Sequence, residues 1–122
     1  MKYLPTGEEM KYADQFTIDT IGLPSMVLME RAAMCVVDAV EREGMDVSKP
    51  LILCGAGNNG GDGYAVARLL QQKGHDVEIL FLGKESSRSA ENRKQMEAQS
   101  YAMGKRDALD EIVRLVEKQC AK

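Results

Sequence analysis

The sequence predicts an α/β domain whose parallel sheet is incomplete within this chain. Two apolar runs, 51–54 and 77–82, are bounded by Pro or Gly, which is typical of short strands in a parallel sheet. A glycine-rich loop and a helical pattern over 61–73 lie between them, so the three segments form one βαβ unit, expected to be right-handed. Parallel sheets usually contain several strands, and this chain of 122 residues offers only two. We therefore expect an open sheet edge and uncovered apolar faces.

Two helices are expected in the lead-in over residues 1–48. Thr6 and Glu9 fit a capping box, which begins a first helix that should end near Thr20, ahead of Gly22. The residues expected on the inward side of this helix are Met10, Ala13, Thr17 and Ile21.

The second helix should begin with Ser25 as its cap and end near Arg42, with Gly44 as the stop signal. Apolar residues recur along it at helical spacing, so one side should face the core. They are Val27, Leu28, Ala32, Val36, Val37 and Val40.

Residues 49–83 hold the βαβ unit, in which helix 61–73 should turn Ala65, Val66, Leu69 and Leu70 inward. The polar segment 84–122 is expected to be helical. A fourth helix should end at Gly104, and Asp107 could cap a last one. The candidate caps of the fourth helix are Ser86, Ser87 and Ser89.

The loop after the first strand, Gly55-Ala-Gly-Asn-Asn-Gly-Gly-Asp-Gly63, is the segment that points to function. Glycine tolerates positive φ and lets a ligand approach the backbone, and the following helix N-terminus attracts anions. Gly55-x-Gly57-x-x-Gly60 matches the dinucleotide fingerprint, but no acidic residue closes the second strand as that fingerprint requires. A Walker A loop is excluded because Gly61-Asp62 stands where Gly-Lys should be.

Asn58, Asn59 and Asp62 are the polar side chains of this loop. Asp62 sits where a carboxylate favours a helix start, so it could act only as a cap. It would also repel phosphate, which suggests that it contacts a hydroxyl, an amide or a cation instead. Carboxamide oxygens suit a hard cation.

Composition excludes several classes of function. A net charge of −3 and the lack of a basic stripe argue against nucleic acid as a partner. No apolar run could span a membrane, and the first residues lack the core of a signal peptide, so a cytoplasmic protein is the simplest interpretation. Cys35, Cys54 and Cys120 have no metal-binding spacing, and His75 is expected at the surface.

The segment Gly57-Asn-Asn-Gly-Gly-Asp-Gly-Tyr-Ala-Val-Ala-Arg68 resembles the signature of the YjeF N-terminal domain, the NAD(P)H-hydrate epimerases. Asp14, the turn Gly22-Leu-Pro24 and the run Leu28-Met-Glu-Arg-Ala-Ala33 resemble the N-terminal pattern of the same family. The resemblance covers roughly residues 5–103. It implies a Rossmann-like three-layer α/β/α domain that epimerises C6 of hydrated NADH or NADPH, and so repairs damaged nicotinamide nucleotides.

The resemblance also implies site residues. The loop would bind the phosphate-bearing part of the substrate, and Asn59 would be one ligand of a bound potassium ion. The substrate-binding residues implied in this way are Asn58, Asn59, Gly60, Gly61 and Asp62. Members of the family are often fused to an ADP-dependent dehydratase, which makes such a domain a candidate partner.

The chain departs from the family after residue 103. The family continues with a Val-Asp-Ala-Leu-Phe-Gly-Thr-Gly type of segment and a Val-Asp-Ile-Pro-Ser-Gly type, which carry the catalytic carboxylate, and neither occurs here. We therefore assign no catalytic residue and expect the chain alone to be inactive, self-associating or marginally stable. Two alternatives stay open: a non-catalytic binding or interaction module of the same fold, and a fragment of an NAD dehydrogenase.

Overall fold

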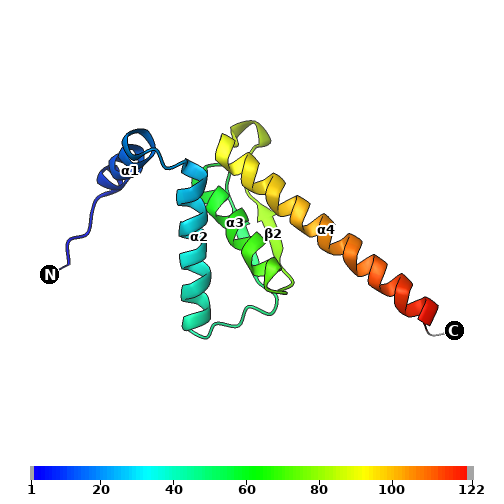
Figure 1. Cartoon of the computed structure of the whole chain (residues 1–122). Helices are drawn as coiled ribbons and strands as arrows, with labels where there is room; N and C mark the ends of the chain where they lie inside the picture. Colours follow the sequence, from blue (N-terminus) through cyan, green and yellow to red (C-terminus); the bar gives the residue numbers. More distant parts are fainter. Residues whose placement is uncertain (1, 121–122) are drawn as a thin grey trace.

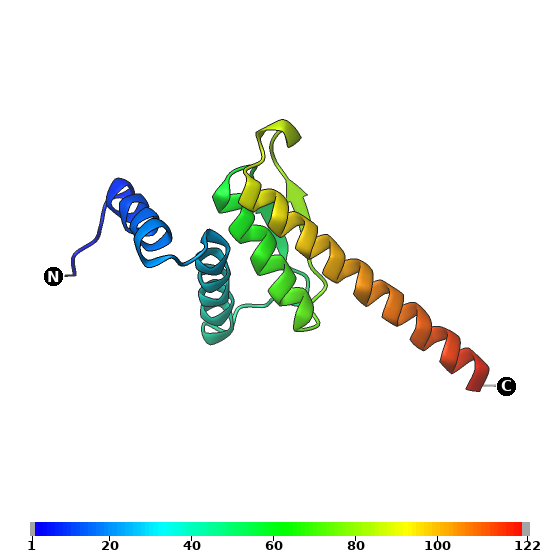
Figure 2. The ribbon, with the colours of Figure 1, turned by 45° about the horizontal axis from the view of Figure 1, so that its top comes forward.

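The computed structural model describes residues 2–120, except for the side chains of residues 105–110. Helix α3 (Asn58–Gln72) covers one face of a two-stranded parallel sheet, and α2 (Ser25–Arg42) and α4 (Ala90–Cys120) pack against α3. Helix α1 (Gly7–Phe16) stands at one end of the molecule, and the C-terminal part of α4 projects from the other, as Figures 1 and 2 show. The fold is of the α/β class, as the sequence predicts.

Helix α1 begins at the predicted capping box. The Glu9 N–H donates to Thr6 Oγ1 at 3.2 Å, and the Thr6 N–H donates to the Glu9 carboxylate at 2.6 Å. A π-helical turn, η1 (Thr17–Ile21), continues the helix and ends at Gly22, whose φ is +86°. The expected inward stripe is wrong, because α1 buries no residue and Met10 is 48% exposed. The helix stands beside the body of the domain and does not pack flat on it.

Helix α2 ends as predicted, with Gly44 at a φ of +66°. Its expected apolar stripe is mostly wrong: of the six predicted residues only Val37 is buried, and the other buried residues are Met29 and Ala33. These three lie four residues apart, along the line on which α2 packs against α3. Ser25 is not the cap, since Pro24 takes that position without a side-chain bond.

The two strands are β1 (Leu51–Cys54) and β2 (Glu78–Phe81), paired in parallel with Leu51 opposite Glu78. The core lies between α2, α3 and the sheet, where residues from all of these elements meet. The central ones are Val37, Ala67, Leu70 and Val77, surrounded by Ile52, Val66, Leu69 and Ile79.

The other face of the sheet is open, as expected from the incomplete sheet. Leu51, Leu53 and Leu80 are 61%, 59% and 49% exposed. Because successive strand residues point to opposite faces, these side chains lie opposite α3. The strands are therefore covered on one face only.

Helix α4 is one continuous helix of 31 residues, which contradicts the two helices expected over 84–122. Gly104 lies inside it and does not stop it; an interior glycine costs a helix only about 1 kcal/mol. The first half of α4 packs on α3 and buries three amide side chains. Residues 111–120 are exposed. A short 3₁₀ turn, η2 (Glu85–Ser87), precedes α4.

Candidate functional site

The predicted glycine loop connects β1 to α3, and α3 begins three residues earlier than expected. Gly57 is its N-cap residue, and the Gly61 N–H makes the first bond of the helix, to the Gly57 carbonyl at 3.1 Å. The N–H groups of Asn58, Asn59 and Gly60 precede that bond and have no partner within the helix. This end of α3 therefore offers donors and the positive pole of the helix dipole to an anion.

Positive φ is not the reason for the glycines in this loop. Within residues 2–120, positive φ occurs only at Gly22, Gly44 and Gly74. Gly60, Gly61 and Gly63 are instead required by packing. A Cβ on Gly60 would stand 1.9 Å from the Gly55 carbonyl oxygen, and one on Gly63 would stand 2.7 Å from Cys54 Sγ.

Gly57 differs from these glycines, because a Cβ on it would meet no atom within 4 Å. Its φ of −83° and ψ of −170° are open to any residue. Neither packing nor backbone geometry requires a glycine here. A glycine at this position would allow a ligand to approach the backbone closely.

Three residues at the start of α4 hold the loop, and the sequence did not single out two of them, Arg88 and Asn92. Asn92 is fully buried and its Nδ2 donates to the carbonyl oxygens of Gly55 at 2.9 Å and Gly57 at 2.7 Å. Arg88 Nη1 donates to Asn92 Oδ1 at 2.6 Å. Ser89, predicted as a helix cap, accepts a bond from the Asn92 N–H at 3.1 Å and so caps α4.

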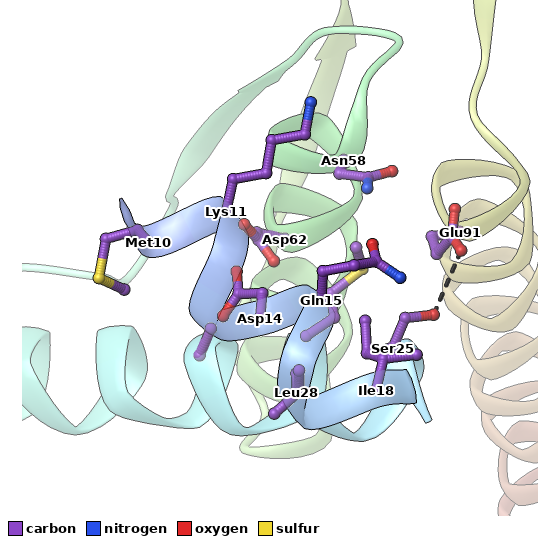
Figure 3. A pocket seen from close by; sticks show the side chains of 12 residues that line it. Met10, Lys11, Asp14, Gln15, Ile18, Ser25, Leu28, Asn58, Asp62 and Glu91 are labelled. Atoms are coloured by element: carbon purple, nitrogen blue, oxygen red, sulfur yellow. Dashed lines mark hydrogen bonds between the residues drawn. The ribbon is translucent and has the colours of Figure 1, made fainter. Parts of the chain in front are cut away.

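A cavity of about 450 Å³ lies beside the loop, between α1, α2 and the first turns of α3 and α4 (Figure 3). Its wall mixes apolar and polar side chains drawn from all four helices. They are Met10, Lys11, Asp14, Gln15, Ile18, Ser25, Leu28, Met29, Ala32, Asn58, Asp62 and Glu91. The Ser25 hydroxyl donates to Glu91 at 3.2 Å and so links α2 to α4 at the cavity.

The charge of the cavity is mainly negative. Asp14, Asp62 and Glu91 line it against a single cationic side chain, Lys11. Burial raises the pKa of the Asp62 carboxyl, and the charge of Asp14 raises it further. The cavity is therefore suited to hydroxyl or amide donors and unsuited to a phosphate.

The structure separates the predicted site residues into three groups. Asn58 and Asp62 line the cavity, and the side-chain oxygen Oδ1 of Asn58 accepts a bond from the Ser89 hydroxyl at 2.6 Å. Gly60 and Gly61 are buried, while Asn59 is exposed and is not part of the cavity wall. Asp62 is not the N-cap of α3, since Gly57 holds that position.

The residues present fit potassium only in part. The carboxamide of Asn59 is exposed and of a type that binds hard cations. A hard cation of this kind needs several oxygen ligands. No group of three or more His, Cys, Asp or Glu side chains is arranged for a metal among the residues that the structure describes.

The remaining candidate residues have structural roles. Tyr64 is buried and its hydroxyl accepts a bond from Arg88 at 3.2 Å. Cys54 is buried beneath Gly63, and burial raises the pKa of its thiol, which disfavours the reactive thiolate. No helix within residues 2–120 has both the length and the apolar character needed to cross a membrane.

Comparison with known proteins identifies the family. Residues 25–119 match the family described as YjeF-related protein N-terminus, so the chain belongs to the YjeF N-terminal domain family. It is 48% identical over 99 residues to an NAD(P)H-hydrate epimerase of Weissella koreensis. It is 49% identical over 86 residues to another of Leuconostoc mesenteroides. The solved structure of the yeast protein YNL200c superposes with a TM-score of 0.67 at 23% identity over 84% of this chain, which supports the fold.

The chain spans less than half the length of these proteins. The matches cover 80% of this chain but 45% of the Weissella relative, and 70% but 39% of the Leuconostoc relative. The superposition likewise covers 45% of the yeast protein. The predicted membership of the YjeF N-terminal family is thus confirmed. The matched residues, 25–119, begin later and extend further than the 5–103 expected from the sequence.

Proposed function

We propose that this chain is the nucleotide-binding half of an NAD(P)H-hydrate epimerase, which inverts C6 of hydrated NADH or NADPH. The relatives that it matches carry that name. The observation that carries the proposal is Gly57, a loop glycine without a packing role beside the unpaired N–H groups of α3. A phosphate oxygen could reach these donors without a side chain in the way.

The charge distribution suggests how the substrate would lie. We place its phosphates at the backbone of Gly57 to Gly60, outside the acidic cavity. The carboxylates of Asp14 and Asp62 would then accept bonds from hydroxyl or carboxamide groups of the same substrate in the cavity. This arrangement agrees with the negative charge of Asp62, which would repel a phosphate placed beside it.

Asn59 is the one residue of this chain that we propose as a potassium ligand. Its carboxamide oxygen would be one ligand, and the other oxygen ligands would come from beyond this chain. We assign no proton-transfer residue within residues 1–122, because epimerisation at C6 needs an acid or base held at the ring and the sequence segments expected to carry it are absent here.

Partners and location follow from the same proposal. A dehydratase domain in the parent protein would use the product of the epimerase. A reducing compartment such as the cytoplasm suits the free thiols of Cys35, Cys54 and Cys120. The open apolar face of the sheet favours self-association of the chain, or a second function as a non-catalytic interaction module.

A coupled assay tests the proposed reaction. A mixture of the two C6 epimers of NADPH hydrate is incubated with a dehydratase that accepts one of them. The protein that contains this chain should let the whole mixture be converted, and its Gly57→Ala variant should slow the conversion of the second epimer. Conversion that stops at the accepted epimer, with the protein folded, would contradict the proposal.

A further inference from the structure

We propose that Asn92 is a positioning residue, whose buried amide aims the N–H groups of the glycine loop at the ligand. This inference rests on the proposed function for the identity of the ligand, but its structural part stands on the loop alone. Asn92 lies on α4, 35 residues after Gly57, and occupies the space left by the missing side chains of two loop glycines. A Cβ on Gly60 would stand 2.8 Å from Asn92 Nδ2, and one on Gly61 would stand 3.3 Å from Asn92 Cα.

The orientation of the Asn92 amide is set by its neighbours. Arg88 can only donate hydrogen bonds, and it donates to one end of the carboxamide at 2.6 Å. The carbonyls of Gly55 and Gly57 can only accept, and they lie 2.9 and 2.7 Å from the other end. A flipped amide would lose all three bonds, so the nitrogen must face the loop.

Arg88 is itself held in place by three other side chains. Its guanidinium carbon lies 3.7 Å from the centre of the Phe81 ring and 5.3 Å from that of Tyr64. Glu85 pairs with the same guanidinium. The positive charge polarises the Asn92 carboxamide and strengthens it as a donor to the loop.

The two carbonyls determine where the loop N–H groups point. In a trans peptide the C=O and the following N–H point in opposite directions. When Asn92 holds the Gly57 carbonyl, the Asn58 N–H is therefore directed away from the Asn92 amide. Ser89 fixes the Asn58 side chain at the same time, through the bond to its carbonyl oxygen.

Three variants separate positioning from mere packing. Asn92→Asp keeps the side-chain volume and an acceptor for Arg88 but removes both donors. Arg88→Met keeps the Asn92 amide and removes the group that orients it. Gln99→Ala is the matched control, because Gln99 is another buried amide on the same face of α4, bonded to Gln71 at 3.2 Å and remote from the loop.

The first measurement is hydrogen exchange of backbone amides in the ligand-free chain, followed by NMR. The Gly61 N–H, which bonds the Gly57 carbonyl, should exchange roughly five- to tenfold faster in Asn92→Asp than in wild type, relative to a reference amide in α2 such as that of Val37. Arg88→Met should give a smaller change of the same sign. The Gln99→Ala variant should leave the ratio unchanged, even where its melting temperature falls as much.

NADPH titration is the second measurement and separates this inference from the proposed function. If the wild type binds NADPH, Asn92→Asp should weaken that binding roughly tenfold more than Gln99→Ala. If the wild type does not bind NADPH, but Gly61 N–H exchange is still faster in Asn92→Asp than in Gln99→Ala, the proposed ligand is overturned and the positioning role is supported. Equal Gly61 exchange ratios in Asn92→Asp, Arg88→Met and Gln99→Ala would overturn the positioning role, whatever NADPH does.

Discussion

Asp14 on α1 and Asp62 on α3 face the same cavity, and the charge of Asp14 adds to the effect of burial in raising the pKa of the Asp62 carboxyl. Asp14 lies before residues 25–119, which match the family model, and Asp62 lies among them. Their negative charges repel each other across the cavity. A ligand that donates hydrogen bonds to both carboxylates would relieve this repulsion.

Replacement of Asp62 by Asn should stabilise the free chain at neutral pH. A carboxyl whose folded pKa is raised binds more protons in the folded than in the unfolded state, so the free energy of unfolding falls as pH rises through that interval. The destabilisation caused by the Asp62 carboxylate is complete at pH values above its raised pKa and absent at pH values below the ordinary pKa of 3.8. Melting temperatures of wild type and Asp62→Asn should therefore differ at pH 7 and converge towards pH 3. A difference that grows in acid would contradict this.

Asp14→Asn is the companion variant. It removes the charge contribution but leaves the burial of Asp62, which is the larger cause of the raised pKa. NMR titration of the Asp62 carboxyl should then show a pKa that is lowered but still above 3.8. An unchanged Asp62 titration would show that the two carboxylates do not interact.

Two alanine substitutions in the loop should separate an effect on NADPH binding from an effect on stability. Gly57→Ala should cost no more than about 1 kcal/mol, since its Cβ meets no atom and only the N-cap preference for glycine over alanine is lost, and it should weaken NADPH binding. Gly60→Ala should cost about 3 kcal/mol, because its Cβ would overlap the Gly55 carbonyl. Urea unfolding and NADPH titration measure the two effects. Normal NADPH affinity in Gly57→Ala would remove the main support for a ligand at this loop.

The open face of the sheet should promote association between copies of the chain. Leu53→Thr removes an exposed apolar side chain and keeps strand propensity, so it should shift sedimentation equilibrium towards the monomer. Ile52→Thr, on the covered face, should lower stability because Ile52 packs against the core. A wild-type chain that is already monomeric, with Leu53→Thr unchanged, would contradict the expected self-association.

Thr6→Ala should unfold α1 without unfolding the domain. An N-cap to alanine change costs about 1 kcal/mol, and no residue of α1 is buried to offset that loss. NMR should show helical shifts lost over Gly7–Phe16 while the melting temperature of the body stays constant. A fall in the melting temperature of the whole chain would mean that α1 is more firmly packed than its exposure indicates.

Local signals in the sequence predict most of the elements. The capping box at Thr6 and Glu9, the turns at Gly22 and Gly44, and the parallel strands around the glycine loop are all present. Each depends on chemistry within a few residues. The inward faces of α1 and α2 were predicted poorly, because which side is buried depends on the neighbours that a helix has in space.

The single long α4 and its role at the site could not be predicted from local patterns. Gly104 reads as a helix stop, but a glycine with negative φ inside a helix is only mildly unfavourable. Asn92 and Arg88 lie in a segment that looks like a solvated, charged helix. Only their position against Gly60 and Phe81 reveals their roles.

Amide chemical shifts during NADPH titration test most directly whether the end of α3 at Gly57 binds the substrate nucleotide. Saturable shifts of the amides of Asn58 to Asp62 are expected, reduced in Gly57→Ala while the fold is kept. Saturation without shifts in this loop, or shifts confined to the exposed half of α4, would contradict binding at this end of α3.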